Sequence, residues 1–300
     1  MYTRILIPLD GSKTAEEVLP YAHTLATKLR VPVELIGVID IVEFAVHISA
    51  EKARYLEKMI EQEERRSMDY LKGIANTFPG LSVNCVIEKG RAAEAIIDKA
   101  GADKGTLIMM ATHGRSGIDR WVLGSVAEKV LRAANNPLLL VRAAKPTTSG
   151  QARLTSVIVP LDGSELAESV LPAVTELAKK LDLEIILFRA FNIPYSIYAG
   201  GDGYYAVNFD QLIAEMKDEA TTYLEKKTGE LKRQGIEKIS FLVKEGLSAD
   251  EIISFGRQTP DNLIAMCTHG RSGPKRWVLG SVTETVVRHC GDPVLVIRAA

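Results

Sequence analysis

The sequence predicts an α/β protein built from two doubly wound, five-stranded parallel-sheet (Rossmann-like) domains in tandem. Three observations predict this fold. A motif near the start of the chain, residues 7–12 (IPLDGS), returns as residues 159–164 (VPLDGS). A longer segment, residues 107–144, aligns without gaps on residues 263–300, and most of the aligned positions are identical. Within each copy, short apolar runs alternate with amphipathic helical segments, a pattern typical of a parallel sheet covered on both faces.

The elements of the first copy follow one another as strand and helix in strict alternation. Runs rich in Val, Ile and Leu predict strands at residues 5–9, 33–39, 82–88, 106–111 and 138–142. Apolar residues spaced three and four apart predict helices at residues 15–29, 50–76, 92–100 and 125–134. Ser12 or Thr14 is the expected N-cap of the first helix. Right-handed crossovers then give an open sheet with helices on both faces.

The chain divides near its middle. Residues 143–151 are small and polar and include Pro146, which predicts a linker between a first domain at residues 1–146 and a second at 152–300. The second copy carries a net insertion of four residues between Asn192 and Gly235. The final strand of each copy is an apolar edge that needs cover, so we expect the halves to pack as an intramolecular pseudo-dimer, and further homodimerisation stays open.

Composition argues against several classes of protein. Hydrophobic residues make up 46% of the 300 residues and charged residues 25%, as in globular domains, and the net charge of −1 gives no general attraction to nucleic acid or an anionic membrane. Cys85, Cys267 and Cys290 show neither a disulfide pattern nor the spacing of a zinc site. Residues 1–4 run directly into the apolar strand that begins at Ile5, without a signal-peptide pattern, so the expected location is cytoplasmic.

The repeated motifs fall where a doubly wound sheet binds ligands, beyond the carboxyl ends of its strands. Asp10 and Asp162 follow the first strand of each copy. The segments 111–117 (ATHGRSG) and 267–273 (CTHGRSG) follow the fourth strands, and a Gly-Ser-Val segment then opens the next helix. A helix start offers unpaired N–H groups and partial positive charge, and glycine lets a phosphate approach the backbone. This constellation suits an anion.

Plainer explanations exist for the same residues. The glycines can simply form a loop turn and an ordinary helix start, and an Asp-Gly-Ser segment is most often a turn. Trp121 and Trp277 are better explained by packing than by stacking on a base. His113 and His269 lack further metal ligands at suitable spacing, which favours hydrogen bonding over metal binding.

These motifs, in this order and present twice, resemble the universal stress protein family in tandem form. Its ATP-binding branch carries Gly-x2-Gly-x9-Gly-Ser/Thr. Here Ala111 and Cys267 replace the first glycine of that pattern in the two copies. The resemblance implies that Asp10 and Asp162 contact the nucleotide or its Mg²⁺, and that the backbone around Val38 and Ala190 meets the adenine. Because Cys267 is bulkier than Ala111, we expect the first site to bind more strongly.

The residues assigned to nucleotide binding are those of the strand ends and helix starts. In the first half they are Pro8, Leu9, Asp10, Val38, Ala111, Thr112, His113, Gly114, Arg115, Gly124, Ser125 and Val126. In the second half they are Pro160, Leu161, Asp162, Ala190, Thr268, His269, Gly270, Arg271, Gly280, Ser281 and Val282. The expected cofactor is ATP, with Mg²⁺ held at most through the nucleotide by Asp10 or Asp162.

Dedicated catalysis has little support in the sequence. Residues 11–14 (GSKT) lack the remainder of a Walker A loop, and neither a dinucleotide fingerprint nor a nucleophile elbow is present. The leading hypothesis is an ATP-binding regulatory protein of the stress response, with weak ATPase activity at most. The alternatives are a scaffold protein of the same fold that binds no nucleotide, and an ATP-consuming enzyme that uses Asp10 or Asp162 to hold Mg²⁺.

Overall fold

The computed structural model describes residues 2–41, 55–112, 123–142, 151–192, 209–268 and 279–298. It divides into two compact units. The first comprises the described residues up to Arg153 together with Pro293–Arg298, and the second comprises those between Leu154 and Asp292.

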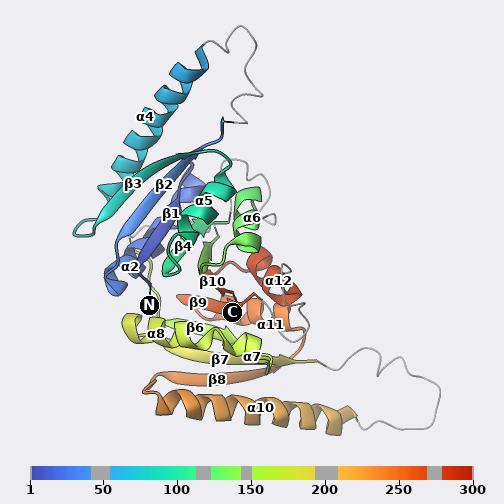
Figure 1. Ribbon diagram of the computed structural model, residues 1–300. Coiled ribbons are helices and arrows are strands. Elements are labelled where there is room, and N and C mark those ends of the chain that lie inside the picture. The colour runs from blue at the N-terminus through green and yellow to red at the C-terminus, as the bar shows by residue number, and fades with distance from the viewer. Residues whose placement is uncertain are drawn as a thin grey trace, which may run out of the picture. The chain divides into compact units, whose positions relative to one another are not determined.

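The first unit contains a parallel sheet in the order β3-β2-β1-β4-β5 (Figure 1). Its strands are β1 (Arg4–Pro8), β2 (Val33–Ile39), β3 (Val83–Lys89), β4 (Thr106–Ala111) and β5 (Leu138–Val141). The side chains of β4 and β5 are buried from end to end because helices cover both faces of the sheet. The strand order reverses between β1 and β4, so the fold class predicted from the sequence is confirmed, together with its topological switch point.

The helices of the first unit lie close to their expected places. They are α1 (Lys13–Glu16), α2 (Leu19–Leu29), α4 (Leu56–Ala75), α5 (Ala92–Gly101) and α6 (Ser125–Ala133). The sequence predicted one helix at 15–29, but the structure has two. Ser12 caps the short α1, and Pro20 lies in the first turn of α2, where a missing N–H costs nothing.

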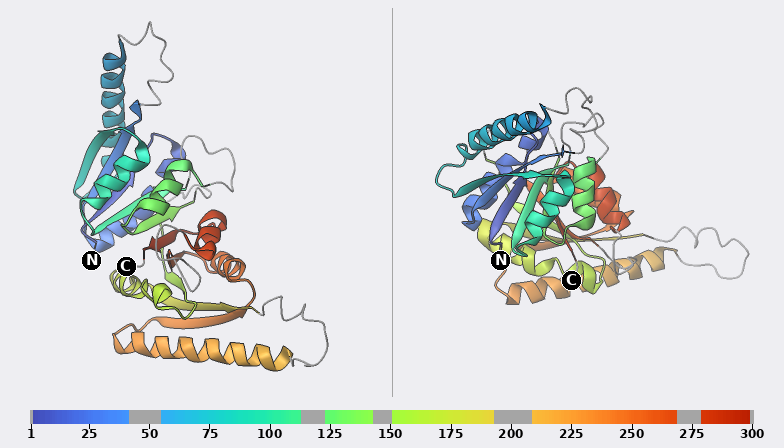
Figure 2. Two further views of the ribbon diagram at one scale, coloured as in Figure 1. Left: turned by 45° about the vertical axis from the view of Figure 1, so that its right-hand side comes forward. Right: turned by 45° about the horizontal axis from the view of Figure 1, so that its top comes forward.

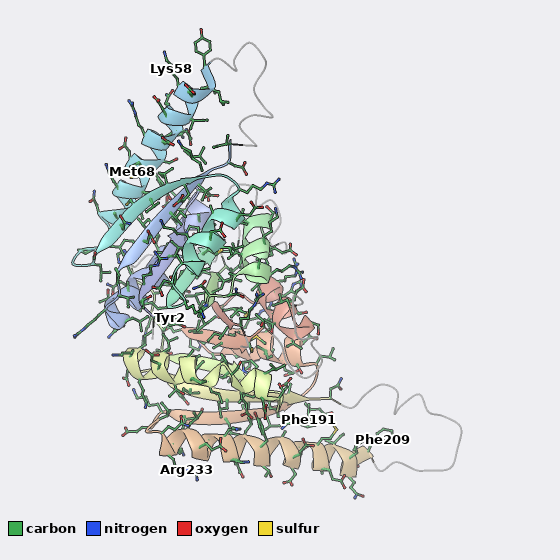
Figure 3. The ribbon with its side chains drawn as sticks, in the orientation of Figure 1. Tyr2, Lys58, Met68, Phe191, Phe209 and Arg233 are labelled. Atoms are coloured by element: carbon green, nitrogen blue, oxygen red, sulfur yellow. The ribbon has the colours of Figure 1, made fainter. Side chains whose placement is uncertain are left out.

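The second unit repeats this plan. Its parallel strands follow the order β9-β6-β7-β8, with β6 (Ser156–Pro160), β7 (Glu184–Phe191), β8 (Ile239–Glu245) and β9 (Asn262–Cys267). Its helices are α7 (Glu165–Glu168), α8 (Leu171–Leu181), α10 (Phe209–Arg233), α11 (Ser248–Gln258) and α12 (Ser281–His289). Figure 2 shows α10 running along β8, and Figure 3 labels the first and last residues of this helix, Phe209 and Arg233. The insertion expected in this copy lies between β7 and β8, partly outside the described residues.

The strand β10 (Val294–Ile297) belongs to the first compact unit, although it follows the second unit in the sequence. It pairs antiparallel with β5, and Leu295 lies opposite Leu139. The side chains of β5 are all buried, and Arg298 donates from Nη1 to Asn135 Oδ1 at 3.0 Å just beyond the ladder. An apolar edge strand leaves a row of main-chain groups unpaired, and β10 pairs that row on β5.

The end of the linker is held against α2. Ala152 donates its N–H to the Pro20 carbonyl at 3.0 Å, and its own carbonyl accepts from Thr24 Oγ1 at 2.7 Å. Ala152 is buried. The chain therefore leaves the first unit from a fixed point.

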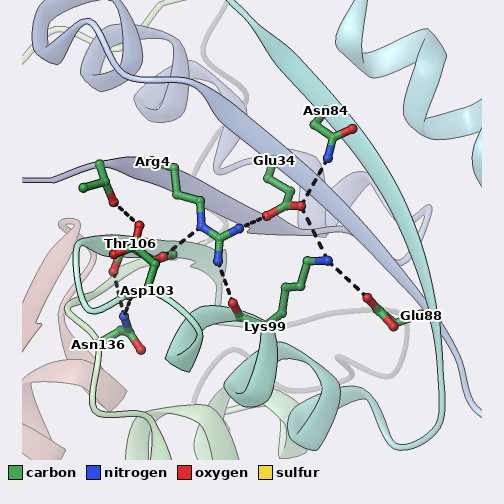
Figure 4. A network of polar contacts seen from close by, with 9 residues as sticks. Arg4, Glu34, Asn84, Glu88, Lys99, Asp103, Thr106 and Asn136 are labelled. Carbon is green, nitrogen blue, oxygen red and sulfur yellow. Dashed lines mark hydrogen bonds and ion pairs between the residues drawn. The ribbon is translucent and has the colours of Figure 1, made fainter.

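A buried polar network crosses the first unit at the start of its strands (Figure 4). Glu34 on β2 lies at its centre, with its side chain only 8% exposed, and forms an ion pair with Arg4 of β1. Its Oε1 lies 3.7 Å from Lys99 Nζ and accepts from Asn84 Nδ2 at 3.3 Å. Lys99 also contacts Glu88 Oε1 at 3.3 Å. One buried carboxylate thus balances two cations from β1 and α5.

A half-buried carboxylate, Asp292, lies near the end of the second unit. Cys290 Sγ donates to Asp292 Oδ2 at 3.2 Å, and burial together with the carboxylate raises the pKa of Cys290 to about 12. Burial raises the pKa of Asp292 as well, although Cys290, Asn262 and Arg257 partly oppose the shift. The aligned residue of the first half is Asn136, whose amide donates to main-chain carbonyls.

We expect Asp292→Asn to stabilise the protein at neutral pH. A carboxyl whose pKa is raised by folding favours the folded state when protonated, so its contribution declines as pH rises from the unfolded pKa through the raised folded value. An asparagine at this position carries no charge, so it avoids the cost of burying an ionised carboxylate at neutral pH. Urea unfolding at pH 4 and pH 8 should show a gain for Asp292→Asn that is larger at pH 8. An equal effect at both pH values would contradict this account.

Candidate functional site

In each unit the parallel strands bring their carboxyl ends to one edge, and the predicted site residues lie along it. In the first unit these are the ends of β1, β2 and β4, and in the second the ends of β6, β7 and β9. Leu9 donates its N–H to the Ile36 carbonyl at 2.9 Å, and Leu161 makes the same bond to Phe188 at 2.8 Å. The main chain after the first strand is thereby fixed beside the strand that carries Val38 or Ala190.

Asp10 is held in a rigid turn. Its Oδ1 accepts from the Ser12 N–H at 2.9 Å and from Ser12 Oγ at 2.6 Å, and Ser12 Oγ accepts in turn from the Ala15 N–H at 3.1 Å. Gly11 has φ +82°, a conformation that glycine adopts without strain. The carboxylate is therefore a turn former, as the plainer explanation expected, and the same bonds fix it at the edge of the sheet.

The second unit repeats the turn closely. Asp162 Oδ1 accepts from the Ser164 N–H at 2.9 Å and from Ser164 Oγ at 2.6 Å. Ser164 Oγ accepts from the Ala167 N–H at 3.2 Å, and Gly163 has φ +87°. A turn kept in both copies with one geometry places both carboxylates in the same way.

The start of α6 is tied to the end of β4. The Gly124 N–H donates to the Thr112 carbonyl at 2.8 Å, and the Thr112 N–H donates to Val141 at 2.9 Å. Gly124 is the N-cap residue of α6, and no side chain caps the helix there. The first N–H groups of α6, from Ser125 onward, consequently begin beside the strand ends. Such groups are suited to binding an anion.

The equivalent tie in the second unit has one additional bond. Gly280 donates its N–H to the Thr268 carbonyl at 2.7 Å, and Thr283 Oγ1 donates to the Cys267 carbonyl at 2.8 Å. The aligned residue in the first unit is Ala127, which has no such donor. The helix start is therefore held more firmly in the second unit.

The two residues that replace the first glycine of the motif are both buried. Ala111 is 6% exposed and Cys267 is 5% exposed. Cys267 Sγ lies 3.3 Å from Ser169 Oγ, between α7 and α8. The additional volume of the cysteine is taken up there.

Part of the predicted site lies outside the described residues. His113, Gly114 and Arg115 belong to that part in the first half, and His269, Gly270 and Arg271 in the second. Their roles stay predictions. The structure brings the described site residues of each half to one edge, with Pro8, Leu9, Asp10, Val38, Ala111, Thr112, Gly124, Ser125 and Val126 in the first unit. The second unit gathers Pro160, Leu161, Asp162, Ala190, Thr268, Gly280, Ser281 and Val282.

Sequence reasoning missed one residue at this edge, Arg189. It precedes Ala190 in β7, and its guanidinium lies beside Gly163 and over the ring of Tyr223. Burial and the hydrogen bond to Glu168 raise the pKa of Tyr223, so its hydroxyl stays protonated. The sequence could have revealed it through the alignment of the second strand of each copy, in which Arg189 is equivalent to Gly37.

A hollow of about 430 Å³ lies elsewhere, between β3 and α5. Its walls carry charges of both signs, including Glu88 and Lys99, which pair with each other at 3.3 Å. Mutually paired charges leave little net attraction for a ligand. The edge of each sheet at the carboxyl ends of its strands is therefore the better candidate site.

Metal and membrane features are also constrained. Among the residues that the structure describes, no three His, Cys, Asp or Glu side chains gather as a metal site would require. Within the same ranges, none of the helices combines the length and the apolar character of a membrane span.

The fold and the site define a class of protein: tandem Rossmann-like domains, each with an Asp-Gly-Ser turn and an uncapped helix start at the carboxyl edge of its sheet. The particular family follows from comparison with known sequences. The model of the universal stress protein family matches residues 1–142 and again residues 154–298. The chain belongs to the universal stress protein family and carries two of its domains.

Individual relatives agree with a tandem arrangement. A universal stress protein of Methanocaldococcus jannaschii is 32% identical over 146 residues, which cover 48% of this chain and 85% of that protein. One of Mycolicibacterium smegmatis is 22% identical over 98% of this chain and 96% of its own length. The crystal structure of a universal stress protein from Archaeoglobus fulgidus matches all of both chains, with a TM-score of 0.68 and 20% identity. That structural likeness supports the fold.

Proposed function

We propose that this chain is an ATP-binding regulatory protein with one nucleotide site in each half. One observation carries the proposal: Gly124 and Gly280 each bond back to the end of the preceding strand, which brings an uncapped helix start beside a fixed aspartate turn. The phosphates would lie on the N–H groups at the start of α6 and α12. The adenine would meet the main chain near Val38 and Ala190.

The donor set also fits a nucleotide-bound Mg²⁺. Asp10 and Asp162 are carboxylates on rigid turns, and Mg²⁺ is usually held by one or two carboxylates together with phosphate oxygens. They would contact the nucleotide directly or through the ion. Mg²⁺ would neutralise phosphate charge in this site, and no further metal ligand of the protein is required.

The arrangement of the chain suggests how the two halves associate. We infer that they form an intramolecular pseudo-dimer through their final strands, and the antiparallel pairing of β5 with β10 supports this. Assembly of two chains into a homodimer is compatible with the same plan. We place the protein in the cytoplasm, where ATP is abundant, and assign it a role in the response to stress.

Mass spectrometry of nucleotide released from the purified, denatured protein tests the proposal. ATP carried through purification is the expected result. Bound ADP would instead indicate an ATP-consuming enzyme. Absence of any nucleotide, followed by absence of binding when ATP is added, would overturn the proposal in favour of a scaffold protein that binds no nucleotide.

We also expect ATP hydrolysis to be slow or absent. Beyond the two aspartates, no general base lies among the described site residues, and each aspartate already accepts two hydrogen bonds through Oδ1. The sequence also lacks a Walker-type lysine. A phosphate-release assay with saturating Mg-ATP measures the rate. Steady-state turnover above about 1 per second, the lower end of ordinary enzymes, would contradict a regulatory role.

A further inference from the structure

The second nucleotide site carries a fixed cation that the first lacks. In β2, Ile36 pairs with Pro8, and in β7, Phe188 pairs with Pro160, so the next residues, Gly37 and Arg189, occupy equivalent places. Gly37 has no side chain. Arg189 therefore introduces a guanidinium beside the residue expected to meet the adenine.

The guanidinium is directed at the Asp-Gly-Ser turn. Its Nη1 lies 3.6 Å from the point where a Cβ of Gly163 would be, and its central carbon lies 5.0 Å from the centre of the Tyr223 ring. Nη2 donates to Glu219 Oε1 at 3.0 Å. The Asp162 and Arg189 charges both act on Tyr223, which places the two groups in one electrostatic environment.

Glu219 compensates the charge of Arg189 only in part. The Arg189 side chain is 10% exposed, whereas that of Glu219 is 70% exposed, so water weakens the ion pair from the carboxylate side. Within the described part of the chain, Nη1 makes no hydrogen bond. Arg189 is therefore a buried cation whose Nη1 can still donate a hydrogen bond and whose partner Glu219 is exposed. Such a group can attract a further anion.

We propose that Arg189 makes the nucleotide site of the second half independent of Mg²⁺, because its guanidinium supplies the positive charge beside Asp162 that the ion supplies in the first half. This inference rests on the proposed function. A divalent cation next to Asp162 would be repelled by Arg189, and the guanidinium itself attracts phosphate oxygens. The preferred ligand of the second half is the free nucleotide anion, and that of the first half is the Mg-nucleotide.

The test uses the full chain with one site disabled at a time. Gly124→Val leaves the second site, and Gly280→Val leaves the first. Each variant is titrated calorimetrically with ATP, once in Mg²⁺ and once in EDTA. The Gly124→Val protein should bind ATP in EDTA at least as tightly as in Mg²⁺, whereas the Gly280→Val protein should lose at least about tenfold in EDTA.

Arg189→Met then assigns the effect to the guanidinium, because methionine keeps an unbranched side chain over Tyr223. In the Gly124→Val background it should weaken binding in EDTA by about tenfold or more. In the Gly280→Val background it should change nothing. Glu219→Gln, a change at an exposed side chain, should tighten binding in EDTA and serves if Arg189→Met does not fold.

The outcomes separate this inference from the proposed function. If the unmodified chain binds no nucleotide under either condition, the proposed function itself fails. If the Gly124→Val protein binds ATP only with Mg²⁺, or if neither Arg189→Met nor Glu219→Gln alters binding in EDTA, the role of Arg189 is wrong and nucleotide binding stands.

Discussion

Replacing Gly124 by valine is expected to abolish ATP binding by the first half while leaving the fold intact. Gly124 has φ −59° and ψ +145°, an extended conformation that valine also adopts, so the backbone tolerates the change. The branched side chain would occupy the space beside the first N–H groups of α6, where the phosphates should lie. We expect affinity to fall at least about 100-fold, or about 2.7 kcal/mol.

Gly280→Val is the matched variant, since Gly280 has φ −61° and ψ +140° at the equivalent helix start. Calorimetric titration of both variants with Mg-ATP also ranks the two sites. Stronger binding by Gly280→Val, which keeps the first site, is expected. Two sites of equal affinity would refute the predicted asymmetry. Unchanged ATP affinity in a folded Gly124→Val protein would show that the phosphates do not bind at the start of α6.

Glu34→Gln is expected to give a large loss of stability. The glutamine keeps the shape of the side chain but removes the charge that balances Arg4 and Lys99, whose side chains are 21% and 27% exposed (Figure 4). Breaking a buried ion network from one side leaves uncompensated charge, which costs about 3 kcal/mol. Urea unfolding of the full chain at neutral pH measures the change.

The second half offers a control in Glu184, a carboxylate of β7 that lies two residues before Ile186, the residue aligned with Glu34. The Glu184 carboxylate accepts from Ser240 Oγ at 2.6 Å, while Ser156 and Phe255 stand where the first half has Arg4 and Lys99. Glu184→Gln should therefore cost about 1 kcal/mol or less, the value of one hydrogen bond. Equal losses from the two variants would show that the charge of Glu34 is unimportant.

Much of the fold was predictable because local and long-range signals agree in this sequence. The strand at 33–39 and the strand at 106–111 were predicted with the bounds that the structure shows, since each is an apolar run ended by turn residues. The Asp-Gly-Ser turns were predictable too. Their positive-φ glycines and their aspartate bonds depend only on neighbouring residues.

Other features depend on contacts between distant residues, which a pattern does not reveal. The break between α1 and α2 combines a serine cap with Pro20, each of which is compatible with one longer helix. The role of Arg189 depends on its contacts with Tyr223, Glu219 and Gly163, which lie far from it in the sequence. The partner of β5 was predictable as a need for cover, but only the structure shows that β10 satisfies it within the first unit.

The place of β10 has a consequence for how the protein is made. β5 lies opposite residues that a ribosome adds about 150 positions later, which corresponds to about 8–30 s at ordinary rates of synthesis. During that interval the newly made first half presents an open apolar edge, the kind of surface that recruits chaperones or another chain. The first sheet is therefore closed only after β10 has been synthesised and has paired with β5, and a product that stops before Val294 would keep the open edge.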